Sequence, residues 1–238
     1  MFRQTAILTA VLGLLAAAPA QAAIVTLSGS TVNYTFNDSL LGLFGTPSIS
    51  GNTLYFTPIN FYAQSLNGAG YSLTRDTVNV QVSAKAGYTL DALNLQETGD
   101  YQLLGRKSNV NVGGQIRVFS LSQPLNQLTD SVTPTAPLNL KGSSTHDWTA
   151  VAGIDLTQHP SSYSASPINV TLENLLTADT LKKNTLAYIE KKSIGLDVIT
   201  SPVPEVKDWA LMLAGLGLVG LQMRRRTRAD GKHIQPGA

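Results

Sequence analysis

Apolar and polar residues alternate one by one through the middle of the chain, and this period of two limits most strongly what the chain can fold into. Val78, Val80 and Val82 are separated by single polar residues. Successive side chains of a β-strand point to opposite faces, whereas a helix needs apolar residues about 3.6 positions apart. The segment is therefore predicted to be a half-buried strand with its three valines packed inward.

Similar alternation recurs between residues 23 and 200. Further strands are predicted at 31–36, 53–57, 88–95, 116–119 and 194–198. The apolar residues between Leu90 and Leu95 slip once in register, which indicates a β-bulge. Turns are predicted at Asn67-Gly68, 85–87, 98–100 and Gly113-Gly114. Short strands separated by polar turns predict an all-β fold over 23–200, an antiparallel β-sandwich of jelly-roll-like or immunoglobulin-like type.

Two parts of this region lack clear alternation. Residues 122–166 are rich in Pro, Ser and Thr, which favours long loops or a strand pair at the edge of the domain. Leu172, Leu175 and Leu176 have helical spacing and predict one short helix before Lys183.

Composition narrows the class of protein. Only 13% of the residues are charged, which fits an extracellular β-rich protein better than a cytosolic helical one. There is no cysteine, so disulfides, thiolate metal sites and cysteine nucleophiles are excluded. Residues 23–204 carry ten basic and twelve acidic side chains. A nucleic-acid-binding domain needs a basic face, so nucleic acid is not an expected partner.

The first 22 residues have the three zones of an export signal. Arg3 supplies a positive start, residues 6–18 are almost wholly apolar, and Ala20 and Ala22 place small side chains before a cleavage site. The apolar run is shorter than the roughly 20 residues that cross a bilayer. We therefore predict a signal peptide over 1–22 with a helical apolar part, and Ala23 as the first residue after cleavage. An uncleaved anchor is the alternative.

A second apolar segment lies near the other end of the sequence. Between Trp209 and Met223 only Gln222 is polar. These fifteen residues, at about 1.5 Å each, span roughly 22 Å as a helix, against a hydrocarbon core of about 30 Å. The segment is predicted to be a short transmembrane helix that anchors poorly in the long term. A basic cluster follows the helix and is expected to stay in the cytoplasm. It consists of Arg224, Arg225, Arg226 and Arg228, and a polar tail over 229–238 comes after it.

The residues just before this helix carry a motif, formed by Val203, Pro204 and Glu205. The Val-Pro-Glu motif, the short apolar helix and the arginine cluster, in this order over 201–228, resemble the PEP-CTERM sorting signal. In that family the proposed processing enzyme is exosortase, an integral-membrane transpeptidase. The resemblance implies that the three motif residues are the processing residues. The usual second proline is Val206 here, and ten residues follow Arg228. An ordinary single-span anchor is the alternative.

Candidate catalytic and metal-binding residues gather between 143 and 162. His146 and His159 have hydroxyl and carboxyl groups nearby in the sequence, but the Gly-x-Ser-x-Gly elbow of a Ser-His-Asp hydrolase is missing. Asp147 and Asp155 lie between the histidines without the tight spacing of metal ligands. A loop calcium site near Asp100 or Asp130 is a further alternative. We predict no catalytic residue, no metal site and no cofactor. The nearby serines are Ser143, Ser144, Ser161 and Ser162.

A glycan site would use stacking aromatic residues. The candidates are Trp148, Tyr163, Tyr71 and Tyr101, although packing in the core or on a sheet face is the simpler interpretation for each. Paired carboxylates for glycoside hydrolysis are not evident, and Glu97 is interpreted as a residue that stabilises a turn.

Together with the PEP-CTERM resemblance, these observations predict an exported, non-enzymatic surface or extracellular-matrix protein associated with exopolysaccharide or biofilm. The alternatives are a carbohydrate-binding β-sandwich module and, in third place, a secreted hydrolase. The expected partners are the Sec translocon, signal peptidase, an exosortase-type transpeptidase and extracellular polysaccharide. The expected location is an inner-membrane-tethered intermediate with a periplasmic domain, followed by the cell surface or the extracellular space.

Overall fold

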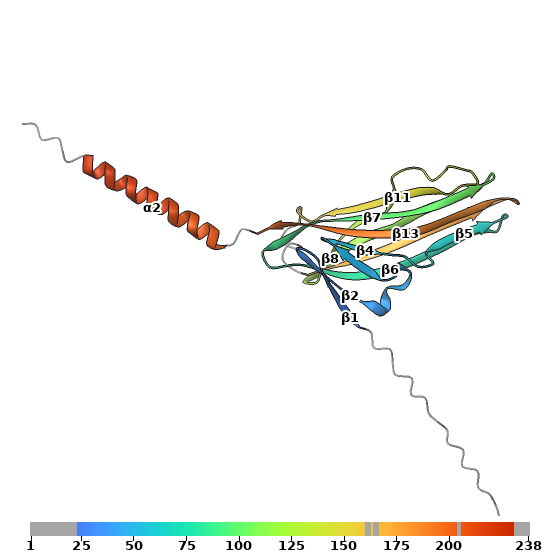
Figure 1. Ribbon diagram of the computed structural model, residues 1–238, viewed down its shortest axis with the longest axis horizontal. Coiled ribbons are helices and arrows are strands. Elements are labelled where there is room, and N and C mark those ends of the chain that lie inside the picture. The colour runs from blue at the N-terminus through green and yellow to red at the C-terminus, as the bar shows by residue number, and fades with distance from the viewer. Residues whose placement is uncertain (1–22, 160–162, 164–166, 204–205, 231–238) are drawn as a thin grey trace, which may run out of the picture.

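The computed structural model describes residues 23–159, 163, 167–203 and 206–230. Its strands form two antiparallel sheets that pack face to face, with the long strands running lengthwise (Figure 1). The six-stranded sheet has the order β1 (Ile24–Ser28), β2 (Val32–Asn37), β6 (Gly70–Ala84), β12 (Ile168–Thr180), β8 (Ser108–Ser120) and β9 (Gln123–Ser131). The seven-stranded sheet has the order β10 (Thr133–Pro134), β11 (His146–Asp155), β7 (Tyr88–Leu104), β13 (Leu186–Pro202), β4 (Thr53–Phe56) and β3 (Pro47–Ser50), with β5 (Tyr62–Leu66) also paired to β13. The prediction of an all-β antiparallel sandwich is confirmed.

The core lies between the sheets and is built from the inward rows of the long strands. Val78, Val80 and Val82 of β6 are at most 2% exposed, as their alternation predicts. Positions between them are more exposed, so this part of the strand is apolar on one side only. Other residues of the predicted strands are equally buried: Ile116, Val118, Ile194, Leu196 and Val198.

Bulges interrupt the pairing of β7 with β13 at two places. The predicted bulge in β7 is confirmed, since Asp91 is the extra residue between two pairs and both Leu90 and Leu93 face the core. In β13 the extra residue is Lys192. Each bulge resets the alternation, so that apolar side chains face inward on both sides of it.

Two of the four predicted turns are correct. Asn67-Gly68 links β5 to β6 with positive φ at both residues, 55° and 82°, and residues 85–87 link β6 to β7. The glycines of 98–100 and 113–114 instead lie within β7 and β8. A neighbouring strand comes too close there for a side chain, because a Cβ on Gly114 would lie 2.0 Å from the Glu173 carbonyl oxygen.

The predicted short helix is wrong. Leu172, Leu175 and Leu176 lie in β12, between β6 and β8, where the first and last are buried and Leu175 lies on the opposite side of the strand. Residues 122–166 are also more regular than predicted. β9 and β10 do lie at sheet edges, but β11 is an internal strand. Its inward row includes the small residues Ala150 and Ala152, which weakens the apolar signal in the sequence.

The sandwich begins at β1, directly after Ala23, and ends with β13 at Pro202. Two short 3-10 turns, η1 (Asp38–Leu40) and η2 (Gly42–Phe44), connect β2 to β3. Beyond the sandwich comes α2 (Val206–Asp230), whose residues 210–223 are exposed (Figure 1). Within the described part of the chain, none of the helices combines the length and the hydropathy that a membrane span requires. The predicted signal helix with Ala20 and Ala22 lies outside the described residues.

Candidate functional site

A polar groove of about 510 Å³ lies on the outer face of the seven-stranded sheet. Its walls are outward-facing residues of β4, β7 and β13. Amides, hydroxyls, a carboxylate and an aromatic ring are the groups that hold a polar, hydroxyl-rich ligand. The side chains that line it include Tyr55, Asn94, Gln96, Thr98, Ser193 and Asp197.

The floor of the groove is shaped by Gly195 and Tyr55, which face each other in the pairing of β13 with β4. A Cβ on Gly195 would lie 3.4 Å from Tyr55 Cε1, so the tyrosine ring lies close over the glycine. Thr53 Oγ1 donates to Asp197 Oδ1 at 2.9 Å and fixes the carboxylate beside it. Tyr55 remains 41% exposed, so its ring is open to a ligand.

Two more tyrosines lie on the same outer face, further along β13. Tyr62 of β5 and Tyr188 of β13 stack with their ring centroids 6.0 Å apart and 29° between their planes. The Tyr188 hydroxyl donates to Glu190 Oε2 at 2.8 Å, and burial together with this hydrogen bond raises the pKa of Tyr188. Tyr55, Tyr62 and Tyr188 form an aromatic row that the sequence analysis did not single out.

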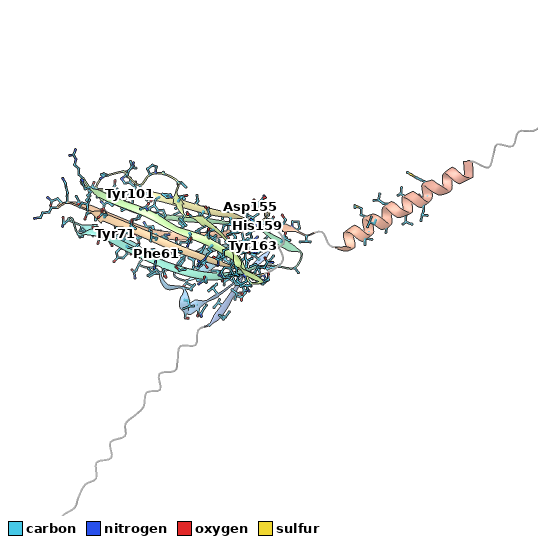
Figure 2. The ribbon with its side chains drawn as sticks, turned by 180° about the vertical axis from the view of Figure 1, so that it is seen from behind. Phe61, Tyr71, Tyr101, Asp155, His159 and Tyr163 are labelled. Atoms are coloured by element: carbon cyan, nitrogen blue, oxygen red, sulfur yellow. The ribbon has the colours of Figure 1, made fainter. Side chains whose placement is uncertain are left out.

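The aromatic residues considered as candidates for glycan stacking are mostly core residues. Trp148, Tyr101 and Tyr163 are at most 4% exposed. Tyr71, which is 66% exposed, lies on β6 of the other sheet (Figure 2). Core packing is therefore the correct interpretation for three of the four residues, and the aromatic row on the outer face consists of different tyrosines.

The two histidines do not assemble a catalytic triad with the described residues. His159 lies at one end of the sandwich near Asp155, with its ring 6.3 Å from the Tyr163 ring (Figure 2). His146 lies on β11 with its ring 5.6 Å from the Tyr101 ring, and its buried Nε2 has no hydrogen-bond partner among the residues that the structure describes. No hydrogen bond joins either histidine to a serine or an aspartate within the described ranges.

The acidic residues weighed as possible metal ligands serve local structure. Asp155 accepts hydrogen bonds from the Thr157 hydroxyl and backbone N–H at 2.6 and 2.8 Å, which lower the pKa of Asp155. Asp130 accepts from the Gly153 N–H at 2.8 Å, and Asp100 forms an ion pair with Lys192. Among the residues that the structure describes, no three His, Asp or Glu side chains come together as metal ligands would.

A second candidate site lies inside the sandwich, where Lys191, Glu97 and Asn174 meet. Lys191 of β13 and Glu97 of β7 form an ion pair with both side chains fully buried. Lys191 Nζ also donates to Asn174 Oδ1 at 2.6 Å. Asn174 belongs to β12, so the cluster joins the two sheets. Lys and Glu are almost never fully buried unless they are paired, because removing each ion from water is costly.

Aromatic side chains enclose the lysine. Its Nζ lies 5.3 Å from the centre of the Phe61 ring and 5.8 Å from that of the Trp148 ring. The indole crosses β7 at Gly99, where a Cβ would approach Trp148 Cζ2 to 2.7 Å and the Glu190 carbonyl oxygen to 1.9 Å. Gly99, predicted as a turn residue, therefore leaves the space in which the indole covers the cluster.

Burial shifts both titratable groups of the cluster toward their neutral forms. It raises the pKa of Glu97 and lowers the pKa of Lys191, against the opposing effect of each partner's charge. The Asn174 amide lies near enough to Glu97 to lower the pKa of its carboxyl somewhat, yet Asn174 Nδ2 and Glu97 Oε1 make no hydrogen bond of ordinary geometry with the described residues. An amine, an amide and a carboxyl are thus held together with little solvation.

The prediction that Glu97 belongs to a turn is wrong, because Glu97 lies within β7 and faces the core. Neither Lys191 nor Asn174 is a predicted site residue. The sequence does contain one signal for this cluster: each of the three residues is a polar residue at a position where the inward row of its strand is otherwise mostly apolar. Alternation can mark three such positions, but it does not reveal that the three rows meet.

The residues of the predicted sorting signal begin at the edge of the sandwich. Val203 follows β13, is 45% exposed, and donates its N–H to the Gly87 carbonyl at 2.8 Å. Pro204 and Glu205 lie outside the described residues. Trp209 and the exposed Met223 lie within α2, as do the arginines of the basic cluster, Arg224, Arg225, Arg226 and Arg228.

Comparison with known proteins assigns no family. No protein-family model and no curated protein matches the chain. Among solved structures, those of infectious bursal disease virus strains Gt and Gx match at 10% identity, with TM-scores of 0.25 and 0.24. Each match covers 85% of this chain, and the chain spans 62% and 63% of the two viral chains. Similarity at this level indicates no function.

Proposed function

We propose that the chain is an exported, non-enzymatic surface or extracellular-matrix protein, carried between an export signal and a PEP-CTERM-type sorting tail. The observation that carries the proposal is where the folded domain begins and ends. β1 starts at Ile24, next to the predicted cleavage site after Ala22, and β13 ends at Pro202, just before the predicted motif. Both signals can therefore be removed without cutting a strand. The choice between a jelly-roll-like and an immunoglobulin-like sandwich stays a prediction.

The exposed apolar surface of α2 supports a temporary stay in the membrane. The large apolar side chains from Leu211 to Met223 are each at least 50% exposed. Apolar surface of this kind is stabilised by leaving water, and the arginines that follow favour the cytoplasmic side. Insertion of α2 as a short membrane helix, which stays a prediction, would leave the sandwich on the opposite side, where an exosortase-type enzyme would meet the motif at 203–205.

The test is the intact mass of the protein made in a bacterium that carries an exosortase-type transpeptidase, and in the same strain without it. Ends near Ala23 and Pro204 are expected in the first strain, and a retained arginine cluster in the second. Replacing both Pro204 and Glu205 by alanine should preserve the tail, whereas Lys207→Ala, outside the motif, should be processed normally. Tails of full length in correctly located protein from both strains contradict the proposal.

The outer groove favours a second candidate function, a carbohydrate-binding module. Sugars are bound by hydrogen bonds to amides, hydroxyls and carboxylates and by packing of their apolar faces on aromatic rings. Tyr55 supplies an exposed ring within a groove whose other side chains are polar. The stacked pair of Tyr62 and Tyr188 continues the aromatic row, which suits an extended polysaccharide.

A glycan array followed by titration calorimetry tests this second function. Tyr55→Ala is expected to weaken binding about tenfold, the equivalent of roughly 1.4 kcal/mol. Tyr71→Ala is the matched control, because Tyr71 is more exposed but belongs to the other sheet. Equal losses in both variants, or a wild-type protein that binds no glycan on the array, would exclude the groove as a glycan site.

A further inference from the structure

We propose that Lys191 and Asn174 react with each other to form an intramolecular isopeptide bond, with Glu97 as the group that transfers the proton. The new bond ties β13 of one sheet to β12 of the other inside the core. It is a covalent modification of the domain and does not depend on the proposed sorting or glycan-binding functions.

The amine and the amide are already in contact. Lys191 Nζ lies 2.6 Å from Asn174 Oδ1, so the carbon that bears this oxygen is an electrophile within reach of the amine. The strands that carry them are held in register by long ladders, β12 with β6 and β8, and β13 with β7. Reacting groups positioned in this way gain a large rate advantage, because little entropy remains to be lost.

Water is excluded from the cluster. Glu97, Asn174 and Lys191 are at most 1% exposed, and the rings of Phe61 and Trp148 lie beside the lysine. An amide in this position is shielded from hydrolysis, so the lysine amine is the nucleophile that it meets. Burial also strengthens the polarisation of the amide carbonyl by a neighbouring acid.

Glu97 supplies the proton chemistry. An ammonium ion cannot attack a carbonyl carbon, so the lysine must first pass a proton to the carboxylate that it contacts. Burial favours this transfer, since it raises the pKa of Glu97 and lowers that of Lys191. The result is a free amine next to a neutral carboxylic acid.

The reaction balances without a co-reactant. In the neutral pair, Nζ attacks Cγ of Asn174, the Nζ–Cγ bond forms, the Cγ–Nδ2 bond breaks, and ammonia leaves. One hydrogen of Nζ remains in the new amide, and the other reaches the departing nitrogen by way of the Glu97 carboxyl, which ends as it began. No electrons are transferred. Asn174 Nδ2 is the atom that leaves, and no described group holds it by a hydrogen bond.

Such a bond suits an exported chain without cysteine. The chain cannot form a disulfide, and its buried ion pair is costly to desolvate. Formation of the amide removes both charges from the core and joins residues 17 positions apart in two different sheets. The cross-link resists reduction and constrains the unfolded chain as a disulfide does.

Mass spectrometry of the full chain under denaturing conditions tests the proposal. The wild-type protein is expected to be lighter than its sequence by one molecule of ammonia, and its tryptic digest should contain a joined peptide that links Asn174 to Lys191. Glu97→Gln, which preserves shape, should show the full mass and separate peptides. Asn174→Asp should lose water instead of ammonia, so its cross-linked form should have the same mass as cross-linked wild type.

Lys191→Arg is the matched control, because it keeps a positive charge but offers no nucleophilic amine. Ammonia loss that persists in this variant belongs to another site, such as Asn67-Gly68, and overturns the proposal. A folded wild-type protein with full mass and separate peptides also overturns it and leaves the cluster as an ion pair only. Circular dichroism checks that each variant folds, and the joined peptide of the wild type decides the matter if a variant does not.

Discussion

The buried carboxyl of Glu97 is expected to make the stability of the fold depend on pH. The substitution Lys191→Met exposes this dependence. Lys191→Met removes the charge that lowers the pKa of Glu97, and the buried carboxyl then keeps a pKa above its ordinary 4.5. A group whose folded pKa is raised stabilises the fold fully below the unfolded pKa. That contribution is lost as the pH rises through the folded pKa, so this variant is expected to become less stable from acid to neutral pH.

Urea unfolding of Lys191→Met at about pH 4 and about pH 8 measures this dependence, and the free energy of unfolding is expected to be lower at the higher pH. The double variant Glu97→Gln, Lys191→Met has no titratable group in the cluster and serves as the control. If both variants lose the same free energy between the two pH values, Glu97 does not titrate as expected.

At the level of elements, two substitutions in β12 test whether this segment is a strand or the predicted helix. Leu176 is fully buried between the sheets, whereas Leu175 lies on the other side of the same strand. Leu176→Ala is therefore expected to lower the free energy of unfolding by about 2–5 kcal/mol. Leu175→Ala should cost less than about 1 kcal/mol. Denaturant titrations of the two variants provide the measurement, and similar losses would indicate that both side chains share one apolar face.

The sequence predicts these elements well where apolar and polar residues alternate strictly, and poorly where one residue type is compatible with two different structures. Val78, Val80 and Val82 mark β6 correctly because β-branched residues in a period of two have one common interpretation. The predicted turns at Gly99 and Gly114 are wrong, because a glycine that permits a turn and one that permits close packing look the same in the sequence. Only the position of the neighbouring strand separates the two cases.

The candidate sites were less predictable than the strands for a related reason. Tyr55, Tyr62 and Tyr188 come from three strands, and their common face depends on β13 pairing with both β4 and β5. Such pairing follows from the whole topology, which a local pattern does not contain. The buried cluster has the same character, since it requires β7, β12 and β13 to bring their polar interruptions to one place.

Across the whole molecule, β13 connects the outer groove, the buried cluster and the predicted sorting motif. It lines the groove on the outer face, supplies Lys191 to the core, and is the last strand before the predicted sorting motif. A protein attached to the cell surface through residues near Pro202 would be pulled through this strand first. The proposed bond from Lys191 to β12 would keep β13 from separating from the sandwich under such a load, which links the inner cluster to the proposed location.

The exposure of α2 predicts that the tail contributes nothing to the stability of the sandwich. Because residues 210–223 are exposed, removal of everything after Val203 should change the free energy of unfolding by less than about 0.5 kcal/mol. Denaturant unfolding of both chains in the same mild detergent measures this difference. Truncation after Lys192 is the control and should abolish cooperative unfolding, because it removes Ile194 and Leu196 from the core. A clear loss of stability on removing only the tail would mean that α2 packs on the sandwich, and a tail of that kind could not be discarded after sorting without weakening the domain.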